Sequence, residues 1–340
     1  MMMALLVLKS KIKNFYEKHY FPVRSALKTL CVFLVLLLIH TNMGYMPALD
    51  NVWLWVVIAG LCGITPDTVS CLVTIGFITL ETLQVSVMMA VTFLIVITIY
   101  LLLFSRMEKR QCELMLALPV LSMLNIGYVV VILAALFFSP AMIPAVIMGL
   151  TLQYGLQGVD SYMASQTGVT DSEQVFNSLH YLVDYIASAK WFWVTLAAYC
   201  VAYLCIYFIR RGKFKHASQI AILVGSIVFM AVELISNILF DLNLDLLPFT
   251  IHVIVCMAIA YVIQFFHLTL DYHGTRKLQF EDDEYYYYVT AIPKYKVAVV
   301  DKTVTRIMPE EEEIPTDLKS ELEKAMEEEM AETNNEDFDE

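Results

Sequence analysis

Residues 51–80 read NVWLWVVIAGLCGITPDTVSCLVTIGFITL, two apolar limbs joined by the turn Thr65-Pro66-Asp67. The limbs cover 51–64 and 68–80, so at about 1.5 Å per residue each would form a helix of only ~20 Å. The hydrocarbon core of a bilayer is about 30 Å thick. We therefore expect a re-entrant helical hairpin here, although two short crossings would leave the chain on the same side of the membrane.

The composition is that of a membrane protein, because 59% of the 340 residues are hydrophobic and only 16% are charged. The net charge of −12 is unevenly distributed. Residues 1–270 carry 14 Lys+Arg and 13 Asp+Glu, whereas residues 271–340 carry 8 and 21. A nearly neutral membrane domain over 25–270 is therefore expected to precede an acidic tail. Nucleic acid is excluded as a partner of that tail, because its phosphates would repel it.

The apolar segments predict an all-α integral membrane protein with about six full spans, two short hairpins and up to ten apolar segments in all. Full spans are expected near 26–39, 85–104, 114–138, 191–209, 217–240 and 248–270. A second hairpin is expected at 141–162, where Ile147-Met-Gly149-Leu150 resembles Ile58-Ala-Gly60-Leu61. A polar turn is expected at 81–84 and a short surface helix around 172–185.

These elements also suggest an internal repeat. Residues 26–110 and 114–215 each read as a span, a hairpin, a second span and a basic stop, and 217–270 adds two spans. Repeats with broken helices are a common plan in transporters. Residues 1–24 form a lysine-rich lead-in, either an interfacial amphipathic helix or an ordinary cytoplasmic segment.

The positive-inside rule orients the chain in a cell membrane, with both termini in the cytoplasm. With that orientation, every one of the 22 Lys and Arg residues except Lys190 lies on the cytoplasmic side. The loops 40–50, 81–84, 139–140, 159–190 and 241–247 are then external.

The sequence predicts neither an enzyme nor a cofactor. It contains no phosphate-binding loop and no HExxH or GxSxG motif. The seven cysteines form no CxxC pair and show no zinc spacing with histidine, so no metal site is expected. His252 and His267 are expected to form hydrogen bonds between helices.

Polar residues within apolar segments are the candidates for solute binding: Glu233, Asp67, Gln153, Gln157 and Asp160. Glu233 is either a proton-coupled, cation-coupled or substrate-contacting acid, or a residue that reaches water or Asn237 near the helix end. Asp67 is either a ligand or an acid that satisfies the first N–H groups of a helix.

The other three candidates are spaced on one helical face, where they form either a cavity wall or a shallow wet limb. The glycines that mark the two expected hairpins are Gly60, Gly63, Gly149 and Gly155.

The tail is expected to have structure of its own. Within 271–308, the runs 285–292 and 295–304 are strand-like and predict a small β-hairpin. Residues 309–340 are acidic, either a helix or disordered. A row at i,i+4 spacing could dock into a partner groove, and it comprises Leu318, Leu322, Met326 and Met330.

Three stretches carry a resemblance to a known family: RKLQFEDDEYYYYVTAIPK at 276–294, AGLCGITP at 59–66 and NILFDLNLDL at 237–246. Over residues 25–307 the chain resembles an uncharacterised family of polytopic membrane proteins from anaerobic Gram-positive bacteria, whose members often carry the label ABC transporter permease. The resemblance implies a transport ATPase as a partner. The second expected hairpin departs from the family pattern, because Gly149-Leu-Thr-Leu-Gln153 replaces a second GL-G-xP.

We therefore expect a multi-pass, permease-like protein for a small solute, with the lipid bilayer and a cytoplasmic protein on residues 271–340 as its partners. The alternative is a non-transporting membrane scaffold in cell-envelope assembly or division, which recruits partners through its acidic tail.

Overall fold

The computed structural model describes residues 11–12, 15–16, 18–104, 106–107, 110–165, 174–212, 216–242, 245–267, 276–281, 286–291, 320 and 323–326. The chain divides into two compact units, Met1–Lys296 and Val297–Glu340. Most of the lead-in at 1–24 lies outside the described residues. In the second unit the described residues are helical, and Met326 is exposed. Leu318, Leu322 and Met330 lie outside them.

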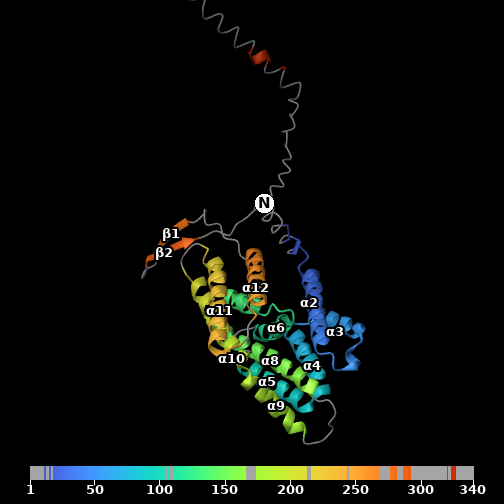
Figure 1. Cartoon of the computed structure of the whole chain (residues 1–340). Coiled ribbons are helices and arrows are strands. Elements are labelled where there is room, and N and C mark those ends of the chain that lie inside the picture. The colour runs from blue at the N-terminus through green and yellow to red at the C-terminus, as the bar shows by residue number, and fades with distance from the viewer. Residues whose placement is uncertain are drawn as a thin grey trace, which may run out of the picture. The chain divides into compact units, whose positions relative to one another are not determined.

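The first unit is a body of α-helices (Figure 1). Its helices are α2 (Tyr20–Asn42), α3 (Val52–Ile64), α4 (Asp67–Val85), α5 (Val87–Phe104), α6 (Gln111–Met123), α7 (Tyr128–Phe137), α8 (Ile143–Ser165), α9 (Gln174–Ser188), α10 (Lys190–Arg210), α11 (Ala217–Phe240) and α12 (Leu246–His267), with 3₁₀ turns at Pro47–Leu49 and Pro140–Met142. Seven helices in the described part of the chain are long and apolar enough to cross a membrane: α2, α4, α5, α8, α10, α11 and α12. The chain is therefore an all-α membrane protein.

Contacts along α2 define two ends of this body. At the basic end, near Arg24, Ser25 donates a hydrogen bond to the Gly63 carbonyl at 3.0 Å. At the far end, His40 packs against Trp55, with ring centroids 4.8 Å apart. Helix α3 therefore runs antiparallel to α2, from the far end toward the basic end. Helix α4 returns, because Asp67 contacts Arg24 and Glu81 contacts His40.

The stretch 51–85 is thus two helices that run between the two ends, and its second limb is longer than expected. The turn expected at 81–84 is wrong, because α4 continues as a helix to Val85. The polar side chain that suggested a turn, Glu81, is fully buried and finds its partners on α2 and in the loop that follows α2. Only Ser86 separates α4 from α5.

The expected span 114–138 is not one helix. It is a hairpin of two short helices, α6 and α7, joined by 124–127 with Asn125 in the left-handed region (φ 56°). The two ends of the hairpin lie side by side, because the Gln111 side chain donates to the Ala141 carbonyl at 2.7 Å. They lie at the basic end, because Glu113 at the start of α6 interacts electrostatically with Asp67, Lys28 and Arg24. At about 1.5 Å per residue, α6 is ~20 Å long and α7 ~15 Å, so the tip lies inside the body.

The second hairpin, expected at 141–162, is also wrong, because α8 is one continuous helix over Ile143–Ser165. Its glycines are packing positions. A Cβ at 149 would lie 2.8 Å from the Met115 carbonyl oxygen, and one at 155 would lie 2.6 Å from the Phe93 ring. The segments 26–110 and 114–215 consequently present different orders of elements.

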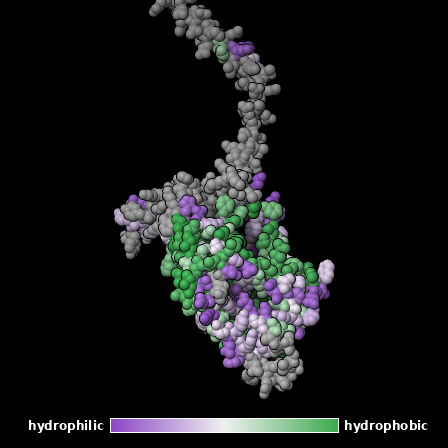
Figure 2. All heavy atoms as spheres, viewed as in Figure 1, coloured by the Kyte–Doolittle hydropathy of each residue, from purple (hydrophilic) through white to green (hydrophobic). Residues whose placement is uncertain are grey.

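The remaining helices match their expected ranges closely. Helix α9 is the surface helix, α11 has the expected bounds, and α10 packs against α11. Helix α7 packs against α11 through Tyr128, which stacks on Phe229 with ring centroids 4.0 Å apart. On the face of the molecule drawn in Figure 2, hydrophobic side chains cover the parts formed by α11 and α2, as expected for surfaces that meet lipid.

Two strands follow the helices. β1 (Arg276–Glu281) pairs antiparallel with β2 (Tyr286–Ala291), so that Phe280 lies opposite Tyr287. Strand β2 falls within the run expected at 285–292. Its partner is the preceding segment, and the second expected run, 295–304, lies outside the described residues.

Candidate functional site

The polar residues predicted on α8 line a cavity of about 240 Å³. It is formed by the C-terminal end of α2, the C-terminal end of α6 and the second half of α8. Its lining residues are Asn42, Met43, Pro119, Ser122, Met123, Gln153, Leu156, Gln157 and Asp160. Gln153, Gln157 and Asp160 therefore share one wall, as their spacing predicted. Neither limb of the 51–80 stretch contributes to the lining.

The cavity adjoins the tip of the α6–α7 hairpin, since Ser122 and Met123 are the last residues of α6 before the chain unwinds. Two features allow α6 and α8 to pack closely together near the cavity. Pro119 has no N–H, so the Met115 carbonyl four residues earlier lacks its usual helical partner. Gly149 lets α8 approach that carbonyl closely.

The Gln153 amide is held at the cavity wall by Ser122. The Ser122 hydroxyl lies 2.8 Å from the Gln153 side-chain amide and 2.7 Å from the Leu118 carbonyl, and its single proton can be donated to only one of them. The other polar atom of the Gln153 amide has no protein partner among the described residues, so it is available to a solute. Irregular backbone at membrane depth is tolerated where it lines a cavity or is buried in protein, and the hairpin tip fits that description.

Helix α12 supports the hairpin tip. The His252 ring is hydrogen-bonded to the backbone of Asn125. One turn on, Cys256 lies against the backbone at Tyr128 and Val129. The two histidines expected to form hydrogen bonds between helices thus differ, because His267 packs with its ring tilted against Phe137, at 4.3 Å between ring centroids.

The loop after α2 contacts the cavity wall at Asp160. The Tyr45 hydroxyl donates a hydrogen bond to the Asp160 carboxylate. Burial raises the pKa of the Tyr45 phenol, and the hydrogen bond to Asp160 raises it further. Tyr45 therefore remains a neutral donor well into the alkaline range and holds one oxygen of the only carboxylate in the cavity lining.

Beside this loop is a buried network that the sequence did not reveal. The Glu81 carboxylate accepts from the backbone N–H groups of Tyr45 at 2.8 Å and Met46 at 3.0 Å, and it pairs with His40 Nδ1 at 2.8 Å. The other ring nitrogen of His40 lies 3.1 Å from Asp50. The network fixes the loop that carries Tyr45. The sequence signals for this network were a histidine and an acid within apolar segments. Because His40 and Glu81 are 41 residues apart, their pairing could not be predicted from spacing.

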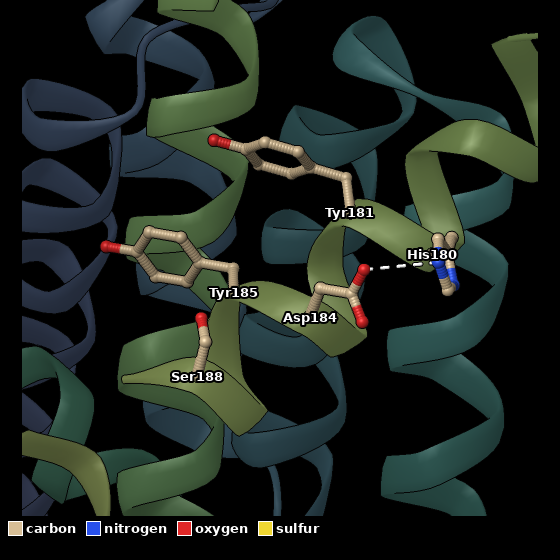
Figure 3. A pocket seen from close by; sticks show the side chains of 5 residues that line it. All are labelled: His180, Tyr181, Asp184, Tyr185 and Ser188. Carbon is tan, nitrogen blue, oxygen red and sulfur yellow. Dashed lines mark ion pairs between the residues drawn. The ribbon is translucent and has the colours of Figure 1, made fainter. Parts of the chain in front are cut away.

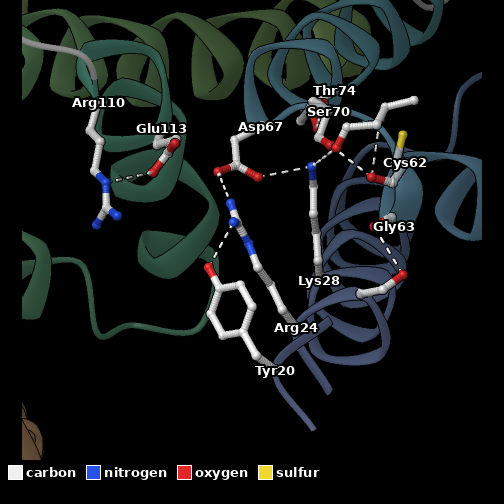
Figure 4. Close-up of polar contacts among 12 residues, drawn as sticks. Tyr20, Arg24, Lys28, Cys62, Gly63, Asp67, Ser70, Thr74, Arg110 and Glu113 are labelled. Carbon is white, nitrogen blue, oxygen red and sulfur yellow. Dashed lines mark hydrogen bonds and ion pairs between the residues drawn. The ribbon is translucent and has the colours of Figure 1, made fainter. Parts of the chain in front are cut away.

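Asp67 lies at the basic end, in a cluster that explains it without a ligand (Figure 4). Its two carboxylate oxygens pair with Arg24 at 3.1 Å and Lys28 at 2.9 Å. Lys28 also donates to the Thr65 carbonyl at 2.6 Å, which is free because α3 ends there. Asp67 therefore fastens the α3–α4 turn to α2. It lies in the first turn of α4, as one of the two alternatives expected, but its partners are the basic side chains of α2 and not the first N–H groups of the helix.

Glu233 lies on α11, away from the cavity lining. Its side chain is 2% exposed, and its Oε2 atom has no hydrogen-bond partner among the described residues. Thr195 of α10 is its hydrogen-bonding neighbour. With 2% of its side chain exposed, Glu233 is shielded from solvent, so an acid that reaches water at the helix end is not what the structure presents.

The two glycines of the first limb differ in their surroundings. A Cβ at 63 would meet Thr29 and Ser25 of α2, whereas one at 60 would meet nothing within 4 Å.

A hollow of about 440 Å³ lies along α9, and its described lining comes from that helix alone. Within it, His180 and Asp184 are paired at 3.2 Å (Figure 3). Both residues of the pair are exposed, so this hollow offers no enclosed site.

The five predicted site residues thus fall at three places: Gln153, Gln157 and Asp160 at the cavity, Asp67 at the basic end and Glu233 on α11. No group of three His, Cys, Asp or Glu residues within the described ranges is arranged to hold a metal ion. In comparisons with known proteins, no family model, no curated protein and no solved structure matches the chain.

Proposed function

We propose that this protein is a permease-like membrane carrier that binds a small neutral or cationic polar solute in the cavity between α2, α6 and α8. The observation that carries the proposal is the α6–α7 hairpin, whose unwound tip ends inside the body beside an amide-lined cavity. Broken helices of this kind surround the solute sites of many transporters.

The chemistry of the lining supports the class of solute. Amide side chains both donate and accept hydrogen bonds, and Gln153, Gln157 and Asn42 supply three of them. The lining also has one carboxylate, Asp160, and none of its residues is basic. A hydroxylated, amide-bearing or amine-bearing solute would be satisfied there, whereas an anion would meet like charge.

The proposed topology places the basic end in the cytoplasm, as the positive-inside rule requires. The α6–α7 hairpin then enters and leaves the membrane on the cytoplasmic side, and α3 and α4 each cross it. The loop with Tyr45, the cavity mouth and α9 face outside. The tail at 271–340 would then be cytoplasmic, where it could recruit a protein partner such as a transport ATPase.

Ligand-induced stabilisation tests the proposal. Purified full-length protein in detergent would be heated with xylose, serine, glutamine, putrescine or succinate. A bound compound at about 100 times its Kd stabilises the fold by about 2.7 kcal/mol. We expect at least one of the first four compounds to raise the unfolding temperature and succinate to have no effect.

Two variants locate the binding. Gln153→Ala removes a wall amide and should weaken binding about 5- to 150-fold, the range for one lost hydrogen bond of about 1–3 kcal/mol. Thr151→Ala is the matched control on the same helix, because the Thr151 hydroxyl bonds to its own helix at Ile147. If both variants bind like the wild type, the cavity is not the solute site.

A further inference from the structure

A buried carboxylate without a cation stands apart from the cavity. Glu233 is in the last third of α11, 2% exposed, and takes part in no ion pair with any described residue. Its Oε2 atom has no hydrogen-bond partner there. An ionised carboxylate in such a place is costly, because neither water nor a positive charge compensates for its desolvation. A carboxyl that keeps its proton avoids that cost.

The groups around Glu233 suit a neutral carboxyl. Two titratable groups interact electrostatically with its carboxyl, the phenols of Tyr154 from α8 and Tyr199 from α10, and neither is a cation. On α12, which packs against α11, His252 is hydrogen-bonded to the backbone of Asn125 at the hairpin tip. On α11 itself, Ser226 is two turns before Glu233 and its hydroxyl is also buried without a partner. Nothing in this set stabilises a negative charge by an ion pair.

Helix α8 connects this residue to the cavity. Gln153 faces the cavity, and the next residue, Tyr154, packs edge-to-face on Phe192 of α10 with ring centroids 5.3 Å apart. Tyr154 interacts electrostatically with Glu233. A shift of α8 that closes the cavity on a solute would therefore move Tyr154 relative to Glu233. It would also disturb the contact with Thr195, which lies on the helix that Tyr154 packs against.

We propose that Glu233 is a proton-binding site within the membrane domain and that the proton it carries is the coupling ion for the cavity. The Glu233 carboxyl holds one proton while α8, α10 and α11 are packed as observed. When these helices move apart, water enters, the O–H bond breaks and the proton passes to water, leaving a carboxylate. The coupling role rests on the proposed function, whereas the proton site itself does not.

Infrared spectroscopy tests the proton site without any solute. Full-length protein reconstituted in liposomes at pH 7 should show the C=O stretching band of a protonated carboxyl, which moves to lower frequency in D₂O. Glu233→Gln should remove that band, and Asp160→Asn should leave it unchanged. Gln closely resembles a protonated Glu, so the variant should also unfold at the same temperature as the wild type. Identical spectra of wild type and Glu233→Gln in this region would overturn the proposal.

Transport tests the coupling. Liposomes that contain a pH-sensitive dye would be given serine, glutamine or xylose across an imposed pH gradient. The wild type should accumulate one of these compounds and take up protons with it. Glu233→Gln should still exchange labelled for unlabelled compound but lose proton entry and accumulation. Proton entry equal to the wild type would refute the coupling. If none of the compounds moves, the proposed function fails for them, and the infrared band still decides the proton site.

Discussion

Removal of the Glu81 carboxylate should strongly destabilise the far end of the protein. The side chain is fully buried and holds two backbone N–H groups and one ring nitrogen of His40, all within 3.0 Å. Glu81→Ala leaves these donors without an acceptor in a site that α4 and the loop close off from water. One unsatisfied buried donor costs about 1–3 kcal/mol.

Two buried backbone N–H groups lose their acceptor, so the expected loss for Glu81→Ala is about 2–6 kcal/mol. That is a large part of the 5–15 kcal/mol typical of a folded domain. Glu81→Gln keeps the shape and one acceptor oxygen for the Tyr45 and Met46 N–H groups, so its loss should be about 1 kcal/mol.

Chemical unfolding in detergent, followed by tryptophan fluorescence, measures these differences. Trp55 is a local reporter, because its ring packs on His40 and its indole N–H donates to the Leu49 carbonyl at 2.7 Å. Asp50→Asn is the control: Asp50 also pairs with His40 but is 65% exposed, so its loss should be below about 1 kcal/mol. Equal stabilities for Glu81→Ala and Asp50→Asn would refute the reasoning.

Further predictions concern backbone approach, strain, pH and the tail. Gly149→Ala should cost about 1–3 kcal/mol, because a Cβ would lie 2.8 Å from the Met115 oxygen, whereas Gly60→Ala has open space and should be neutral or slightly stabilising in the same unfolding assay. Asn125→Val should cost about 1–2 kcal/mol and Asn125→Gly much less, since the residue is left-handed; equal losses would contradict this. Tyr45→Phe should destabilise below pH ~10 and matter progressively less above it, because the raised pKa of the folded phenol means that its contribution is lost as the pH rises past the unfolded value. A chain cut after 270 should keep solute binding if the protein is a carrier, and should lose its cellular role with its helices inserted if it is a scaffold.

The sequence predicted best the elements whose ends are marked locally. Helix α11 has the predicted bounds because basic residues precede it and Asp241 follows its last apolar residue. The wall of Gln153, Gln157 and Asp160 was also predictable, since spacing along one helix determines which side chains share a face.

The two hairpins could not be placed in this way. The run at 114–138 has no charged residue, so hydropathy favoured one span, although Pro119 and the Asn125-Ile126-Gly127 sequence were signals of a break. In α8 the glycines and amides suggested a break, but they face Met115, Phe93 and the cavity. Limb length suggested that residues 51–80 turn back within the membrane, whereas contacts with both ends of α2 show that they run the length of the body.

The pairing of Glu81 with His40 illustrates the remaining limit. A polar residue at the end of an apolar run normally indicates a turn at the membrane surface. Here the partners of the carboxylate are 35 to 41 residues earlier in the chain, and only the folded arrangement brings them to α4.

The side of the membrane reached by residue 139 tests the account most directly. If α6–α7 is a hairpin that returns to the cytoplasm, the loop before α8 is cytoplasmic; if 114–138 were a full span, it would be external. A cysteine would be placed at Ser139 in a chain whose seven native cysteines have been replaced, with Ala48 as the external control and Arg211 as the cytoplasmic control. A membrane-impermeant thiol reagent applied to intact cells should label position 48 but neither 139 nor 211, and all three after the membrane is opened. Labelling of position 139 in intact cells would contradict the account.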